Sequence, residues 1–221
     1  MRFDIITIFP KTFDSYLNES MMKRARAKNL VDISVYDLRK FSRDKHKKVD
    51  DRSYGGGPGM VLKLEPLVRA ISSLKLKVKS EKLKVILFSA AGKQFDAKMA
   101  REWAKKYKRI IMIAGHYEGV DERIFSVLKT KNYKLEAVSV GPYVLTGGEL
   151  PAMIIVDTVA RHIPGVIGKA ESLEERRHGV GVPMYTRPEV FKWQGKNYRV
   201  PKVLLSGNHK KIDEWRRKQT K

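Results

Sequence analysis

Three short glycine-bearing segments carry the residues best suited to chemistry, and each follows an apolar stretch of the chain. They are residues 89–92, residues 115–123 with the sequence GHYEGVDER, and residues 139–151 with the sequence SVGPYVLTGGELP. The paired glycines Gly147 and Gly148 leave room for a flat or charged ligand to lie against bare backbone amides. An ordinary turn between a strand and a helix explains that last segment equally well. All three segments together predict a ligand site more strongly than any one of them.

A fourth segment, residues 39–63, has the composition of a long phosphate-binding loop. Its stretch RDKHKKVDDRSYGGGPGM combines six basic residues, three aspartates and four glycines. Glycines let the backbone approach a ligand closely, and the basic side chains are suited to phosphates. Neither GKS nor GKT follows, so this is not a Walker loop. The alternative is a mobile, solvated linker.

A regular alternation of strands and helices is expected to position these segments. Strand patterns occur at residues 3–9, 31–38, 84–88, 109–114 and 135–140, and helix patterns at residues 10–22, 64–79, 95–107, 124–128 and 149–161. Unbroken apolar strands are typical of a sheet that is covered on both faces. The predicted fold class is therefore α/β with a parallel sheet, whose strands gather their carboxyl ends, and the glycine-bearing segments, at one edge. The last helix is apolar around most of its circumference and is expected to be largely buried.

Composition narrows the classes of function. The chain has 221 residues, a formal net charge of +22 and no cysteine. The basic excess favours a polyanionic partner, although basicity can also serve solubility or follow genome composition. Without cysteine, disulfides, thiolate nucleophiles and cysteine-based zinc sites are excluded. We expect a cytoplasmic protein with no signal peptide and no membrane association, and the missing GxGxxG after the first strand disfavours a Rossmann nucleotide site.

Chain character changes after residue 161, where glycine, proline and charge replace periodic segments. We predict a domain over residues 1–161, a linker over residues 162–182 and a small basic lobe over residues 183–221. Residues 206–208 should form the turn before a final helix, with Trp193 and Trp215 as apolar anchors of the lobe.

Six motifs, in order along the chain, closely resemble the bacterial tRNA (guanine-N1)-methyltransferases of the SPOUT class. They are GGGPGM at residues 55–60, GHYEGVDER at 115–123, VGPYVLTGGELPAM at 140–153, RHIPGV at 161–166, YTRPEV at 185–190 and LLSGNH at 204–209. The resemblance implies a domain with a C-terminal trefoil knot, a mainly helical C-terminal lobe and a homodimer whose active sites are shared between subunits. It further implies S-adenosyl-L-methionine as methyl donor and tRNA as substrate, methylated at N1 of the guanine immediately 3′ of the anticodon, position 37.

Site residues follow from the matching motif positions. The resemblance implies that the donor is bound by Ser89, Gly92, Gly115, Tyr117, Glu118, Val140, Gly141, Pro142, Tyr143, Val144, Leu145, Gly147 and Gly148. It implies that the tRNA anticodon stem-loop is bound by Asp50, Arg52, Tyr54, Gly55, Gly57, Arg187, Ser206, Asn208 and His209. Glu118 and the substrate phosphates could together hold magnesium, but no ligand cluster in the sequence demands it.

Methylation of N1 requires a base to remove its proton and a positive group to stabilise charge on O6. The family's arginine matches Arg161, which could otherwise simply cap a helix. The family's aspartate has no counterpart, because Arg176 stands at its position in a segment about three residues shorter than the family pattern. Our hypothesis is that Glu175, or Glu174 after a shift, is the base, and the alternative is that both are solvated linker carboxylates. Ala90 and Pro142 also depart from the family pattern, and the family's final C-terminal helices are expected to be trimmed.

Two other functions fit parts of this pattern. A knotted RNA-binding protein that has lost catalysis would explain the altered segment around Glu174 and Glu175, but the intact donor motifs and Arg161 oppose it. A related knotted enzyme acting on ribosomal RNA or on ribose would share the donor motifs but should lack GGGPGM and YTRPEV. We therefore expect a tRNA methyltransferase whose affinity for RNA falls steeply with salt and whose target base is flipped out of the stack.

Overall fold

The computed structural model describes residues 1–74, 82–130, 133–168 and 181–219. The chain divides into two compact units, Met1–Val166 and Ile167–Lys221, which are described separately. Glu174, Glu175 and Arg176 lie outside the described residues.

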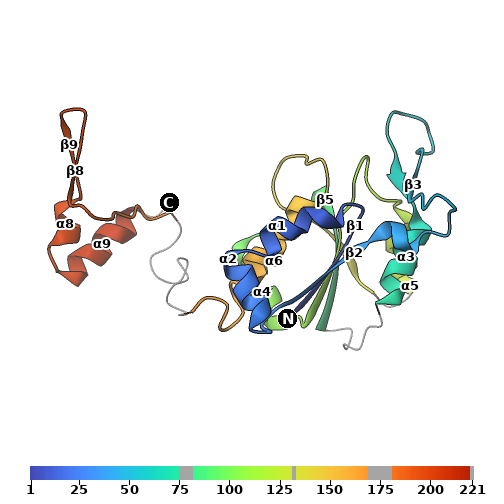
Figure 1. The fold of residues 1–221 in the computed structure, drawn as a ribbon, viewed down its shortest axis with the longest axis horizontal. Helices are drawn as coiled ribbons and strands as arrows, with labels where there is room; N and C mark the ends of the chain where they lie inside the picture. The colour runs from blue at the N-terminus through green and yellow to red at the C-terminus, as the bar shows by residue number, and fades with distance from the viewer. Residues whose placement is uncertain (75–81, 131–132, 169–180, 220–221) are drawn as a thin grey trace. The chain divides into compact units, whose positions relative to one another are not determined.

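A five-stranded parallel sheet forms the centre of the first unit (Figure 1). Its strands are β1 (Arg2–Thr7), β2 (Asp32–Asp37), β5 (Leu83–Gln94), β6 (Arg109–Ile113) and β7 (Leu135–Ser139), in the order β2-β1-β6-β5-β7. Phe3 on β1 lies opposite Ile33 on β2 and Ile110 on β6, which fixes the central register. The predicted α/β class with a parallel sheet is confirmed.

Helices cover both faces of this sheet. On one face lie η1 (Pro10–Phe13), α1 (Asp14–Leu17), α2 (Ser20–Ala27), α4 (Ala97–Lys106) and α6 (Glu149–Ala160), and on the other lie η2 (Leu38–Phe41), α3 (Leu64–Ser73) and α5 (Arg123–Thr130). Each face has its own hydrophobic core. Phe3 and Trp103 belong to the first core, whereas Ile6 and Ile124 belong to the second, as the alternation of side chains along a strand requires.

Two predicted helices differ from the structure. The pattern over residues 10–22 folds into three short pieces, because Glu19, the N-cap of α2, is extended and Ser20, the first residue of α2, has φ 45°. The helix expected over residues 64–79 ends at Ser73, and residues 75–81 lie outside the described residues. In contrast, Asp96 caps α4 by accepting a hydrogen bond from the Met99 amide at 2.7 Å.

β5 continues well beyond the expected end at Ser89. Phe88 and Lys93 both lie opposite Val138 of β7, so residues 89–92 form a bulge inside the strand. The prediction that this segment is a loop after the strand is therefore wrong. Pairing resumes because Gly92 lies directly against β7, where an added Cβ would be 2.5 Å from the Val138 nitrogen.

Part of the loop predicted over residues 39–63 is fixed by strand pairing and by burial. β3 (Asp50–Asp51) pairs antiparallel with β4 (Val61–Leu62), and Val49 and Leu62 are buried in the second core. The connecting segment of residues 52–60, called the glycine-rich ribbon below, is therefore fixed at both ends by β3 and β4.

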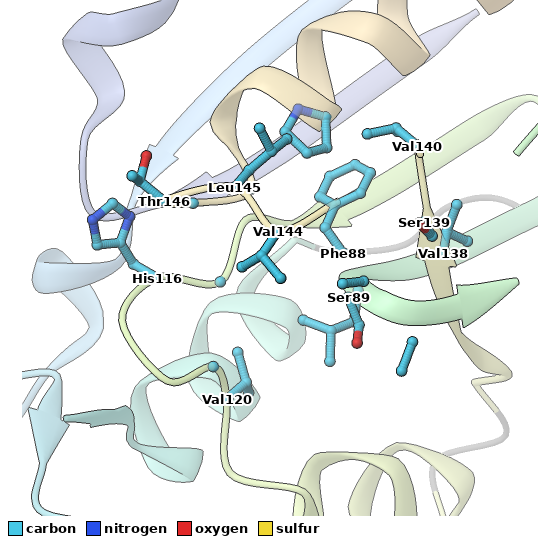
Figure 2. Close-up of a pocket in the computed structure, with 18 of the residues that line it drawn as sticks. Phe88, Ser89, His116, Val120, Val138, Ser139, Val140, Val144, Leu145 and Thr146 are labelled. Carbon is cyan, nitrogen blue, oxygen red and sulfur yellow. The ribbon is translucent and has the colours of Figure 1, made fainter. Parts of the chain in front are cut away.

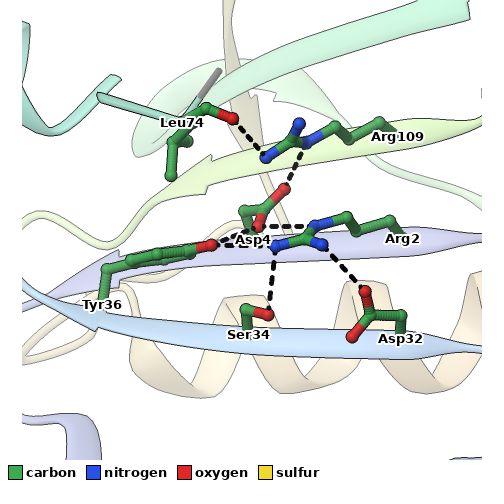
Figure 3. Close-up of polar contacts among 7 residues, drawn as sticks. All are labelled: Arg2, Asp4, Asp32, Ser34, Tyr36, Leu74 and Arg109. Carbon is green, nitrogen blue, oxygen red and sulfur yellow. Dashed lines mark hydrogen bonds and ion pairs between the residues drawn. The ribbon is translucent and has the colours of Figure 1, made fainter. Parts of the chain in front are cut away.

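An ionic network around the buried Asp4 carboxylate lies at the amino ends of the strands (Figure 3). Asp4 is fully buried and accepts hydrogen bonds from Arg109 Nε at 2.5 Å, Arg2 Nε at 3.0 Å and the Tyr36 hydroxyl at 3.0 Å. The second guanidinium group, on Arg2, also reaches Asp32 at 3.0 Å. Three donors thus satisfy the buried Asp4 carboxylate, as a buried charge requires.

The second unit contains the hairpin β8 (Val190–Trp193) and β9 (Lys196–Arg199), then α8 (Lys202–Leu205) and α9 (His209–Gln219). The hairpin was not predicted. The turn at residues 206–208 is confirmed, because the Asn208 side chain accepts a hydrogen bond from the Lys211 amide at 3.1 Å at the start of α9. Trp215 is half-buried beside Tyr185, but the expected anchor Trp193 is 57% exposed, so that expectation is wrong.

Candidate functional site

The predicted ligand segments converge on one cavity at the carboxyl edge of the sheet (Figure 2). Its volume is about 400 Å³, and its walls come from the bulge in β5, the loop after β6, and β7 with the loop that follows it. Ten of the thirteen residues predicted to bind the donor line this cavity: Ser89, Gly115, Tyr117, Glu118, Val140, Tyr143, Val144, Leu145, Gly147 and Gly148. Convergence of the three segments, which the sequence predicted, is observed.

Three of the predicted donor residues do not line the cavity. Gly92 faces the β7 backbone, and Gly141 lies under the Tyr143 ring, which an added Cβ would strike. Pro142 is exposed. Gly92 and Gly141 are thus explained by close packing within the protein, and Pro142 by its place in an exposed bend.

Gly148 allows two loops of the chain to pass in close contact. Its amide donates a hydrogen bond to the Gly115 carbonyl at 2.8 Å, and an added Cβ would be 2.6 Å from the Ala114 Cα. Gly147 forms an isolated antiparallel bridge with His116. The amide of Gly148 is therefore already used within the protein, and the expectation that both glycines offer bare amides to a ligand is wrong for this one.

A buried polar group that the sequence analysis missed lies behind the cavity. Glu149 is 6% exposed and accepts a hydrogen bond from the Thr7 hydroxyl at 2.6 Å. Its other carboxylate oxygen lies 3.6 Å from His116 Nδ1, a buried nitrogen that makes no hydrogen bond within the described part of the chain. An added Cβ on Gly147 would strike both groups. The signal available in the sequence was the carboxylate directly after the glycine pair.

The glycine-rich ribbon between β3 and β4 reaches the rim of the cavity. Glu118 donates its amide hydrogen to the Met60 carbonyl at 3.1 Å, and an added Cβ on Gly59 would be 2.5 Å from the Glu118 carboxylate. Desolvation, together with the charge of Asp50 and a hydrogen bond to it, raises the pKa of the Tyr117 hydroxyl above its usual value. Asp50, predicted to bind substrate, thus interacts with Tyr117, which lines the cavity.

The tip of this ribbon is open to solvent. Tyr54 is 98% exposed, and Arg52 is exposed as well. Gly55, Gly56 and Gly57 have φ between 82° and 105°, and in the described part of the chain no atom lies within 4 Å of an added Cβ on any of them. Positive φ values at three successive residues explain the triple glycine, because side chains rarely adopt this conformation.

Comparison with known proteins identifies the family. The family model described as tRNA (Guanine-1)-methyltransferase TrmD matches residues 1–221. The chain belongs to this family. A tRNA (guanine-N(1)-)-methyltransferase of Dictyoglomus turgidum is 48% identical over 222 residues, covering 99% of this chain and 84% of that protein. Those of Clostridioides difficile and Dehalococcoides mccartyi are 45% and 47% identical over the whole chain, covering 92% and 86% of each relative.

Arg161, which matches the arginine of the methyltransferase motif RHIPGV, lies far from the cavity of its own chain. It is the C-cap of α6, whereas Gly147, Gly148 and Pro151 line the cavity at the helix N-terminus. Twelve helical residues separate the two ends, which corresponds to about 18 Å at 1.5 Å per residue. Within one chain, the structure does not bring Arg161 together with the predicted donor site.

The remaining predicted site residues lie in the second unit or outside the described residues. Arg187, Ser206, Asn208 and His209 are all exposed, and the Ser206 hydroxyl donates to the Val203 carbonyl at 2.7 Å. The two candidate bases, Glu174 and Glu175, belong to residues 169–180, which the structure does not describe.

Metal and membrane features were also sought in the described ranges. Among those residues, no group of three or more histidine and carboxylate side chains is arranged to hold a metal ion, so the structure gives magnesium no support. Within the same ranges, no helix combines the length and the apolar character needed to cross a membrane.

Proposed function

We propose that this protein transfers a methyl group from S-adenosyl-L-methionine to N1 of the guanine at position 37 of tRNA, immediately 3′ of the anticodon. The observation that carries the proposal is the cavity at the carboxyl edge, which is built from the same three segments that carry the family's donor motifs. Ligands of open α/β sheets bind at this edge. The sequence match over the whole chain supports the reaction.

The cavity suits a donor with both a flat apolar part and charged parts. Its volume of about 400 Å³ lies within the range of about 300–1,000 Å³ common for ligand pockets. Phe88, Val120 and Val138 provide apolar walls, and Glu118 and Glu122 provide carboxylates. The donor carries its methyl group on a positively charged sulfur. Guanine N1 attacks this methyl carbon much more readily after it has lost its proton than in its neutral, protonated form.

Removal of the N1 proton is therefore the step that the protein must promote. In our proposal Glu175, or Glu174, accepts this proton, and Arg161 stabilises the negative charge that develops on O6. N1 then forms its bond to the methyl carbon as the carbon–sulfur bond breaks. The products are N1-methylguanine in the tRNA, S-adenosylhomocysteine and a protonated carboxylate.

A homodimer completes this site. Arg161 lies at the end of α6 away from the cavity of its own chain. This position supports an arrangement in which Arg161 of the partner subunit supplies the positive charge at the site. α6 is buried on its sheet side, but Leu150 is 54% and Ile154 is 39% exposed, which leaves an apolar strip for a second copy. The close backbone contact between Gly148 and Ala114 supports the trefoil knot that the family resemblance implies.

Substrate binding in this proposal relies on positive charge. The open ribbon tip with Arg52 and Tyr54, and the exposed basic lobe with Arg187 and His209, face solvent and suit the phosphates of an anticodon stem-loop. Nothing in the described residues favours the alternative of an RNA-binding protein that has lost catalysis.

The test is single-turnover methylation of an unmodified tRNA transcript with guanines at positions 36 and 37. We expect one added methyl group, mapped by mass spectrometry of nuclease fragments to N1 of guanine 37. A transcript with adenine at position 37 should remain unmodified. Methylation at another base, or no product with saturating donor, would overturn the proposal.

The choice of base is tested with Glu175→Gln and Glu174→Gln, with Glu171→Gln as a control in the same segment. We expect Glu175→Gln to slow the single-turnover step by about 100-fold or more, the usual contribution of a positioned base. The control should retain the wild-type rate. Near-native rates in both the Glu175 and Glu174 variants would eliminate these carboxylates.

A further inference from the structure

The hairpin of the second unit presents an aromatic face that no part of the proposed mechanism uses. Phe191 and Trp193 alternate along β8, and Tyr198 on β9 lies directly opposite Phe191. Residues two apart on a strand, and residues directly opposite each other, point to the same face of a sheet. The three side chains are 53%, 57% and 54% exposed. A contiguous set of large aromatic groups this exposed marks a surface that binds something.

Local geometry holds this face ready for a planar ligand. The Phe191 and Trp193 rings are stacked, with centroids 6.2 Å apart and planes 12° from parallel. The hairpin closes through a two-residue turn, in which Gln194 has φ 48° and Gly195 has φ 74°. Positive φ at both central residues is the turn whose twist matches paired strands. Two flat rings therefore face solvent on a defined backbone.

The charge of the hairpin indicates whether its aromatic face is suited to a protein or to a nucleic acid. Lys196 pairs with Trp193 and so lies on the aromatic face, whereas Lys192 and Arg199, which pair with Asn197 and Val190, lie on the other face of the same hairpin. The segment from Val190 to Arg199 contains no acidic residue. Protein interfaces enriched in aromatic residues are depleted in lysine, and a second copy of this chain carries a net charge of +22. Exposed aromatic rings beside uncompensated cations are instead the combination that binds unpaired nucleotides, by base stacking and phosphate contact.

We propose that the face formed by Phe191, Trp193 and Tyr198 stacks on unpaired bases of the tRNA substrate, and that Lys196 on the same face contacts the RNA backbone. The proposal rests on tRNA as the substrate and adds a base-stacking surface in the second unit. Because every nucleobase has a π-face, this surface recognises single-stranded structure and not a particular sequence.

The experiment compares Trp193→Ala with Asn197→Ala, a neutral substitution on the opposite face of the same hairpin. Binding of unmodified tRNA transcript and of a fully paired RNA duplex is measured by fluorescence anisotropy, and methylation is measured at saturating tRNA. We expect Trp193→Ala to weaken tRNA binding by about tenfold or more. Asn197→Ala should bind like wild type, and Trp193→Phe, which keeps a ring, should recover most of the affinity.

Several readouts separate this surface from general folding and from the reaction itself. Duplex binding, S-adenosylhomocysteine binding and the rate at saturating tRNA should be the same in all variants. Equal tRNA affinity for Trp193→Ala and Asn197→Ala would overturn the proposal. So would conversion of a dimer to a monomer by Phe191→Ala with Trp193→Ala in sedimentation, which would assign the face to a second copy. Failure of tRNA methylation in the wild-type protein would overturn the proposed function but would leave the binding comparison intact.

Discussion

The amino and carboxyl ends of the parallel strands, called the two edges here, differ in how completely their buried polar groups are hydrogen-bonded. At the amino edge, Asp4 is fully buried and receives hydrogen bonds from two arginines and a tyrosine. At the carboxyl edge, His116 Nδ1 is buried without a hydrogen bond in the described residues, and Tyr117 has φ 58°. Unsatisfied groups and unusual backbone conformations collect where ligands bind. The fold thus concentrates its ionic stabilisation at the edge opposite the site.

The largest expected effect breaks the amino edge. Asp4→Ala leaves the buried Arg109 guanidinium without its counter-charge, and breaking such a pair costs about 3–5 kcal/mol. Denaturant unfolding should show this loss. Donor binding per folded molecule should stay unchanged, because the cavity lies at the other edge.

A control within the same network sharpens this expectation. Asp32 pairs with Arg2 but has a side chain that is 60% exposed, so Asp32→Ala should cost less than about 1 kcal/mol. Equal losses for the two variants would contradict the assignment of stability to the buried carboxylate.

An intermediate effect is expected at the carboxyl edge with Gly148→Ala. The added Cβ would lie 2.6 Å from the Ala114 Cα, where backbone must move to make room. Overpacking of this kind costs about 1–3 kcal/mol of folding stability. The backbone shift that relieves it displaces Gly115 and Gly148 in the cavity wall, so S-adenosylhomocysteine binding should weaken by about tenfold or more in calorimetry. Gly168→Ala is the matched control, since no atom of the described residues lies within 4 Å of its added Cβ. If both variants bind equally, close passage of the two loops does not shape the donor site.

The smallest effect concerns Tyr16, beside α6. Burial, with the charge of Asp157 and a hydrogen bond to it, raises the pKa of Tyr16 to about 12. The fold favours the neutral phenol, so this contribution is fully present below pH 10 and is lost as the pH rises from 10 to 12. Tyr16 is 41% exposed, so we expect a change of less than about 1 kcal/mol. Wild type should therefore lose unfolding free energy more steeply than Tyr16→Phe over this range, and parallel curves would contradict it.

Local sequence patterns predicted the features that depend on local chemistry. The parallel sheet, the turn before α9 and the convergence of three glycine-bearing segments all follow from periodicity and from residues with special backbone freedom. Motif matches located most of the cavity wall. The proposed roles of the candidate bases remain predictions.

Features that depend on distant partners escaped prediction. The bulge at residues 89–92 exists because β5 meets Val138 twice, which no window along β5 reveals. Glu149 resembled an ordinary acidic residue at a helix start, and only the fold places it against Thr7 and His116. The hairpin was missed because its turn, Gln194 with Gly195, lacks the usual asparagine or aspartate.

The most direct test of the central claim is a crystal structure of the protein with S-adenosylhomocysteine at saturating concentration. Our account predicts that the ligand occupies the cavity between the β5 bulge and the loops after β6 and β7, in contact with Ser89, Tyr117 and Leu145. Ligand bound at another place, with this cavity closed or empty, would contradict the account.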